Sequence, residues 1–281
     1  MIEFKFKWMD REGTPIVKDA AIKAYARQVL ADYRPELLEK PGKIDGIHFL
    51  ESYLKANVEV LNIYHESDED PIAGAAVFNR GRVRVFDKEH LRSAEITVDA
   101  GTVLLDNSTM EEGKEGFALF TQLHEGGHLC LHPTAFDERL QPNAYYGQKM
   151  QMAARNAIIC KRSNISGGYG YRKGRLETSE DFREHQANIF AAELAMPEKP
   201  FRELATQLIS DCGLDYIRDR IVVMDTIHQY TPSYPRRRML RQIAETFGVS
   251  RTAAEVQMWS RGFFMTDTEY ERTQKKISIA V

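Results

Sequence analysis

Two histidines and a glutamate stand together in one short segment, His124-Glu125-Gly126-Gly127-His128. Histidines four residues apart project from one face of a helix, so both imidazoles can reach a single zinc ion. The glutamate that follows the first histidine lies beside the position where a water molecule would be activated, and it can act as a general base. The segment therefore predicts a catalytic metal site with His124 and His128 as ligands and Glu125 as the base.

The surrounding residues favour a helix from about Glu115 to His132, which Pro133 would end. Apolar side chains recur at helical spacing along this stretch. Gly126 and Gly127 each cost such a helix about 1 kcal/mol relative to alanine, so a purely structural helix has no reason to contain them. Glycines suit a place where another backbone or a substrate comes close, and we expect such an approach here.

A catalytic zinc site also needs a third protein ligand and an open position. The metzincin solution is a histidine six residues after His128, but Thr134 stands there. A second helix, with a capping-box signature at Thr178, offers Glu184 and Asn188 on one face. We expect Glu184 to bind the metal and Asn188 to accept a hydrogen bond from the outer nitrogen of a ligand histidine.

The two segments together resemble the ImmA/IrrE family of zinc metallopeptidases. The second segment runs from Glu184 to Pro197, where Ala-Asn, Phe-Ala-Ala and Met-Pro follow the glutamate. The strand expected from Thr102 to Asp106 resembles the one that precedes the active-site helix of the family. The stretch from Ile243 to Arg261 is similar to its C-terminal helix-turn-helix-like segment, and the resemblance covers most of residues 15–265.

The resemblance implies an α+β fold of the zincin-like, gluzincin type. Its small antiparallel sheet would pack on helices, and a helical C-terminal helix-turn-helix-like segment would follow. The family also implies a zinc-dependent endopeptidase, with Zn²⁺ held by His124, His128 and Glu184 and with Glu125 as the base. Its protein substrate would be a helix-turn-helix transcriptional repressor, whose cleavage derepresses stress-response or mobile-element genes.

One alternative from a different class stays open at this point. The protein would then be a non-catalytic, zinc-stabilised regulator that binds a repressor or DNA without cutting. Glu125 separates the two readings, because a purely structural metal site needs no base beside the ion. We expect His132, at the end of the first helix, to cap the helix dipole rather than bind the metal. His185 projects about 100° away from Glu184 and is expected at the surface or behind the ligands.

The pattern predicts two parts in the chain. Residues 1–200 would form the metallopeptidase domain, and residues 201–281 a helical C-terminal region. An insertion at 133–177 would contain a helix within Ala153–Cys160. It would also contain a glycine-rich, basic stretch, Ser163–Arg175, that we expect to be a flap near the cleft.

Strands are expected ahead of the active-site helix. Val58 and Val60 alternate with polar residues, and an apolar run follows from Ile72 to Phe78. Turn signals at Asn79–Gly81 and Asp99–Gly101 predict two successive hairpins, so the sheet is expected to be antiparallel.

Composition limits the remaining functions. The 281 residues are 43% hydrophobic and carry a net charge of −3, so no global basic field points to nucleic acid or a membrane surface. No apolar stretch is long enough to span a bilayer. The basic cluster of Arg236–Arg238 and Arg241 is small, so we expect its arginines to face solvent rather than DNA. Three well-separated cysteines without a secretion signal indicate buried thiols in the cytoplasm.

Overall fold

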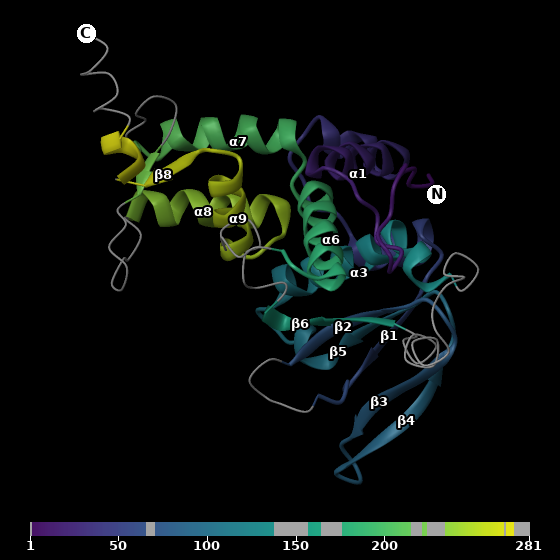
Figure 1. Cartoon of the computed structure of the whole chain (residues 1–281). Helices are drawn as coiled ribbons and strands as arrows, with labels where there is room; N and C mark the ends of the chain where they lie inside the picture. Colours follow the sequence, from purple (N-terminus) through teal and green to yellow (C-terminus); the bar gives the residue numbers. More distant parts are fainter. Residues whose placement is uncertain are drawn as a thin grey trace.

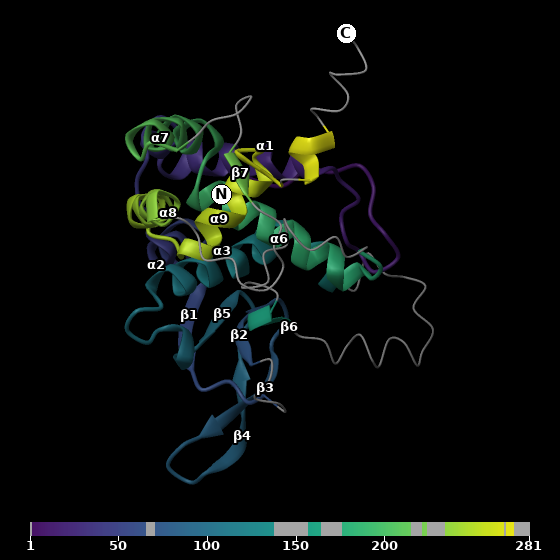
Figure 2. The same ribbon diagram turned by 90° about the vertical axis from the view of Figure 1, so that its left-hand side faces the viewer.

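The computed structural model describes residues 2–65, 71–137, 157–163, 176–214, 221–223, 234–266 and 268–272. The fold is mixed α/β, and a small sheet lies against a layer of helices (Figures 1 and 2). This arrangement is compatible with the predicted α+β class. Within those ranges, no helix combines the length and the apolar character that crossing a membrane would require.

Three helices form the layer that carries the candidate site. The helices α3 (Glu115–Leu131) and α6 (Ser179–Ala195) pack side by side, and α1 (Asp19–Tyr33) packs on α6. At the start of α6, the side chain of Thr178 accepts a hydrogen bond from the Asp181 N–H, and the Asp181 carboxylate accepts one from the Thr178 N–H. The predicted capping box is therefore confirmed.

Short helical turns connect these elements to the sheet. They are η1 (Pro35–Leu38), α2 (Gly46–His48), the π-helical turn η2 (Phe49–Tyr53), η3 (Asn107–Thr109) and η4 (Pro133–Phe136).

The main sheet has four strands in the order β1 (Asn57–Leu61), β5 (Thr102–Asp106), β2 (Ile72–Val77) and β6 (Ala157–Lys161). The outer pair, β1 and β5, is parallel, and the other two pairs are antiparallel. The sheet is therefore mixed, which corrects the expectation of a purely antiparallel one. It lies under α3, which contacts both β2 and β5 (Figure 1).

The two predicted hairpins are wrong. The strands β3 (Gly81–Asp87) and β4 (Arg92–Val98) pair with each other in a separate two-stranded ribbon. The reason lies in β5, which is buried at every position. A strand buried on both faces belongs inside a sheet, so β5 pairs with β1 and β2 instead of with the more exposed β4. The turn residues predicted where the chain reverses direction, but they did not predict which strands pair.

The helix expected within Ala153–Cys160 is also wrong in its described part. Residues 157–161 form the strand β6, and residues 153–156 lie outside the described residues. Ile158 and Cys160 are buried, whereas Ile159 between them is 48% exposed, which is the alternation of a strand. A short apolar run cannot be separated from a buried helix by periodicity alone, and the pairing with β2 decides the outcome.

The C-terminal region contains α7 (Glu198–Asp211), α8 (Tyr234–Phe247) and α9 (Arg251–Ser260). Two short strands, β7 (Ile221–Val223) and β8 (Phe264–Thr266), pair in parallel beside them. Gly248, with a φ of +70°, ends α8, and Ser250 caps α9 by accepting a hydrogen bond from the Ala253 N–H.

This region packs directly on the helix that carries the two histidines. A Cβ added to Gly116 in α3 would lie 2.4 Å from the backbone nitrogen of Ser250. Side chains of α3, α6, α7, α8 and α9 share one hydrophobic cluster. The C-terminal helices therefore help to fix the position of α3.

The basic cluster differs from the expectation at one residue. Arg236 is 3% exposed, and its guanidinium lies 3.4 Å from a Glu255 oxygen and over the ring of Phe264. It shares the buried face of α8 with Met239 at i+3. Arg237, Arg238 and Arg241 are exposed, so three of the four arginines face solvent as predicted.

Candidate metal centre

Three side chains from two helices converge in the interior. The Nε2 atoms of His124 and His128 lie 2.9 Å apart. One Glu184 oxygen lies 3.2 Å from the first nitrogen, and the other lies 3.3 Å from the second. All three side chains are at least 98% buried. The structure therefore brings together the three residues that the sequence indicates as metal ligands.

The hydrogen bonds behind the histidines fit this role. His124 Nδ1 lies 3.2 Å from the side-chain oxygen of Asn188, and His128 Nδ1 lies 3.0 Å from the Nδ1 of His132. A neutral imidazole that donates through Nδ1 presents a lone pair on Nε2. With that assignment, two nitrogen lone pairs and a carboxylate point at one place, which is a donor set that suits zinc. The residues present therefore fit the ion that the sequence predicts.

The electrostatic environment favours the same protonation states. Burial lowers the pKa of His128 from 6.5 to about 4, so its imidazole is neutral near pH 7. Burial opposes the ionisation of Glu184, but while no metal is bound His128 and His124 can offer a charge or an N–H to its oxygens, which outweighs burial and holds the pKa of Glu184 well below its usual range. Neutral imidazoles and an ionised carboxylate are the forms that bind a metal.

Glu125 is buried beside this cluster. Neither of its carboxylate oxygens has a hydrogen-bond partner among the described residues. Burial raises the pKa of Glu125 well above its usual value, and the nearby charge of Glu184 raises it further. A raised pKa makes a carboxylate a stronger base than it is in water, which suits the role of a general base.

His132 ends α3 and is not one of the three converging ligands, as expected, but it makes a contact that the sequence analysis did not anticipate. Its ring is buried, with Nδ1 facing His128 and Nε2 lying 3.0 Å from Gln186 Oε1. The Gln186 amide in turn donates to the carbonyl of Pro15 at 2.8 Å. Burial holds the pKa of His132 well below 6.5, so it carries no charge with which to cap the helix dipole. Its spacing of four residues from His128 was the available signal, because that spacing puts both rings on one face.

The two glycines of the motif lie where an added side chain would be tightly packed against its neighbours. A Cβ added to Gly127 would lie 3.3 Å from the Cα and the carbonyl oxygen of Ala187 in α6. One added to Gly126 would lie 3.0 Å from the ring of Phe49. The predicted close approach of another backbone is confirmed at Gly127, and it lets α3 and α6 share one cluster of ligands.

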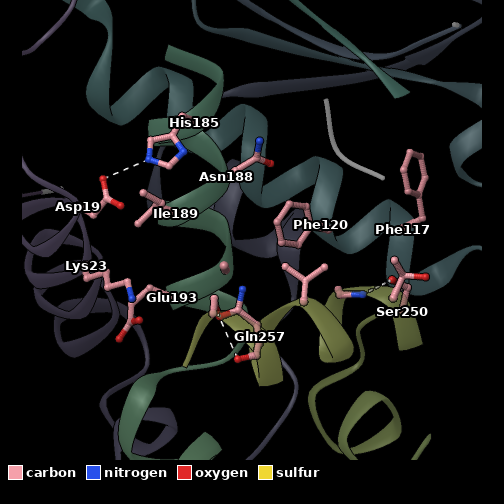
Figure 3. A pocket seen from close by; sticks show the side chains of 16 residues that line it. Asp19, Lys23, Phe117, Phe120, His185, Asn188, Ile189, Glu193, Ser250 and Gln257 are labelled. Atoms are coloured by element: carbon pink, nitrogen blue, oxygen red, sulfur yellow. Dashed lines mark hydrogen bonds and ion pairs between the residues drawn. The ribbon is translucent and has the colours of Figure 1, made fainter. Parts of the chain in front are cut away.

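A pocket of about 520 Å³ adjoins the centre between α1, α3, α6 and α9 (Figure 3). Asn188 lines it and also contacts His124, so this side chain connects the pocket with the centre. His185 points toward Asp19 across one wall, with Nε2 3.1 Å from Oδ1, and not toward the ligands. Further lining residues are Lys23, Phe117, Phe120, Ile189, Glu193 and Gln257.

Two other expectations concern the cysteines and the flap. Cys130 and Cys160 are buried, whereas Cys212 is only half-buried, so the prediction of three buried thiols is wrong for Cys212. Apart from Ser163, the predicted flap Ser163–Arg175 lies outside the described residues.

Two histidines four residues apart on one helix, with a glutamate from a second helix, form a donor set that can hold a metal ion. Residues 168–258 match the family model for the IrrE N-terminal-like domain of the M78 peptidases. The resemblance to the ImmA/IrrE family is therefore confirmed for this part of the chain, and the family is one of metallopeptidases. The match includes Glu184 and begins after the two histidines. No curated protein matches the chain.

Proposed function

We propose that this protein is a zinc-dependent endopeptidase. The observation that supports the proposal most is the position of Glu125, a buried carboxylate with no hydrogen-bond partner among the described residues, beside three converging ligands. A metal site that only stabilises the fold has no use for such a group, because an unsatisfied buried carboxylate costs free energy. A base in a hydrolytic site explains its presence.

The proposed roles follow from the geometry. A bound zinc ion would polarise the scissile carbonyl and lower the pKa of water to about 7. Glu125 would accept the proton of the attacking water and deliver it to the leaving amine. Asn188 and His132 would orient the rings of His124 and His128 through their Nδ1 atoms.

The finer parts of the proposal rest on the family resemblance. The protein would be a zincin of the gluzincin type, with a helix-turn-helix repressor as its substrate and derepression of stress-response or mobile-element genes as the outcome. Such a substrate places the activity in the cytoplasm. The arrangement of α8 and α9, two helices joined across Gly248 and Ser250, is compatible with the helix-turn-helix-like segment of the family.

A direct assay tests the substrate. The purified full-length protein is incubated, with and without zinc, with a helix-turn-helix repressor encoded beside its gene, and the products are followed by gel electrophoresis and mass spectrometry. We expect one defined cut that a chelator prevents. Stoichiometric binding of the repressor without a cut would support the non-catalytic regulator instead.

A further inference from the structure

A second cluster of metal-binding side chains overlaps the first one. The ligand atoms of His124, Glu125 and Cys160 all lie within 4.8 Å of one another, and all three residues are buried. Cys160 belongs to the strand β6 and not to either of the helices that carry the other ligands. The thiol therefore approaches the centre from the sheet side.

The register of β6 explains why the thiol points at the centre. Cys160 lies opposite Gly74 of β2, and residues directly opposite in an antiparallel pair project from the same face. A Cβ on Gly74 would lie 2.9 Å from a Glu125 oxygen, so this face of the sheet looks at the base. Cys160 therefore lies on the face of the sheet that is turned toward Glu125, and the absence of a side chain at Gly74 leaves room for the Glu125 carboxylate.

The position of the thiol matters because it is close to the place where the attacking water would bind. Three protein ligands leave one open position on a tetrahedral zinc ion, and catalysis needs that position for water. The general base must stand beside it. Cys160 lies within 4.8 Å of ligand atoms of the base and of His124 but is not grouped with His128 and Glu184, so its sulfur must move toward the ion to take the position that the reaction requires.

We propose that Cys160 is a fourth protein ligand of the metal and keeps the enzyme latent. The inference rests on the proposed function, because it concerns the regulation of the same site. On binding, the thiol gives up its proton, which metal binding releases, and the thiolate occupies the position that the attacking water needs. Activity then requires that the sulfur leave and that a water molecule take its place.

The backbone of β6 reinforces the block. It pairs with β2 through Ile158 opposite Ala76 and Ile159 opposite Ala75, next to the base. Extended peptides commonly bind by adding a strand to an open sheet edge. While β6 holds the edge of β2, an extended substrate cannot pair with β2 on that side. We infer that an activating event that displaces β6 would remove the cysteine from the centre and open the edge of β2 at the same time.

X-ray absorption at the zinc edge tests the ligand in the unmodified, full-length protein. We expect one sulfur at about 2.3 Å together with nitrogen and oxygen ligands at about 2.0–2.2 Å. In Cys160→Ala the sulfur should be lost while zinc remains stoichiometric. The control is Cys130→Ala, because that buried cysteine contacts Tyr25 instead and its removal should leave the sulfur in place.

A rate measurement tests the latency. If one molecule in ten has released the sulfur, Cys160→Ala should cut the repressor about tenfold faster than the wild type. A zinc shell of only nitrogen and oxygen in the wild type overturns the inference and leaves the peptidase proposal standing if cutting is seen. A third outcome is a sulfur ligand in the wild type and no cutting by Cys160→Ala. The ligand assignment would then stand, but the peptidase proposal and the latency would both be contradicted.

Discussion

His128 and His132 face each other through their Nδ1 atoms, 3.0 Å apart, in the interior of the protein. One of these nitrogens must donate and the other accept, so the second ring fixes the tautomer of the first. The partner of His132 on its other side is Gln186, which is anchored in turn to the Pro15 carbonyl. A chain of three hydrogen bonds therefore orients a candidate metal ligand from behind.

Replacing His132 should weaken the metal site without removing a ligand. For His132→Ala we expect a 10- to 100-fold loss of zinc affinity, the usual cost of removing a partner behind a ligand histidine. Competition with a chromophoric chelator measures it. His90→Ala is the matched control, since His90 lies exposed on the β3–β4 ribbon. Equal affinities of the two variants would show that His132 has no orienting role.

The contact between Gly127 and Ala187 should be sensitive to a single methyl group. In Gly127→Ala the new Cβ would press on the α6 backbone at 3.3 Å and on the Phe190 ring at 3.1 Å. We expect a loss of about 1–3 kcal/mol in the free energy of unfolding, despite the higher helix propensity of alanine. Urea unfolding of the metal-free protein measures it, and a stability equal to or above the wild type would contradict the packing account.

The junction of α6 with the C-terminal helices depends on a buried carboxylate. Glu193 lies 2.9 Å from Arg27 Nη1 and 3.7 Å from Arg261 Nη2, and its side chain is 1% exposed. Glu193→Gln would remove one of the two carboxylates beside the buried Arg261 guanidinium and leave only Glu198, 3.6 Å from Nε, so we expect a cost of about 1.5–3 kcal/mol. Thermal unfolding should show this as a large fall in Tm.

The control for that variant is the exposed pair of Lys199 and Glu39. Glu39→Gln should cost less than about 1 kcal/mol, because solvent screens this pair. If the two variants have the same Tm, Glu193 does not hold the junction together.

The sequence was most informative where the signal is local. The spacing of His124 and His128, the capping box at Thr178 and the shared face of Glu184 and Asn188 depend only on helical geometry. That geometry is the same in every helix, so the side chains that share a face could be predicted without knowing the fold. The bound metal and the catalytic roles remain predictions.

What could not be predicted depends on contacts between distant parts of the chain. The pairing of β5 with β1 and β2, and of β6 with β2, is set by which strands are buried on both faces. Cys160 could not be connected to the centre for the same reason, because its position follows from the β6 register. His132 carried a local signal, but its proximity to Pro133 favoured the interpretation as a helix cap.

The most direct test of the central claim is the substitution Glu125→Gln. Glutamine keeps the size of the side chain but cannot accept the proton of the attacking water. The variant should bind one zinc ion as the wild type does, as measured by elemental analysis, and should cut the repressor roughly 10²-fold more slowly or worse. Wild-type cutting rates in a zinc-loaded Glu125→Gln protein would contradict the assignment of Glu125 as the base and, with it, the proposed mechanism.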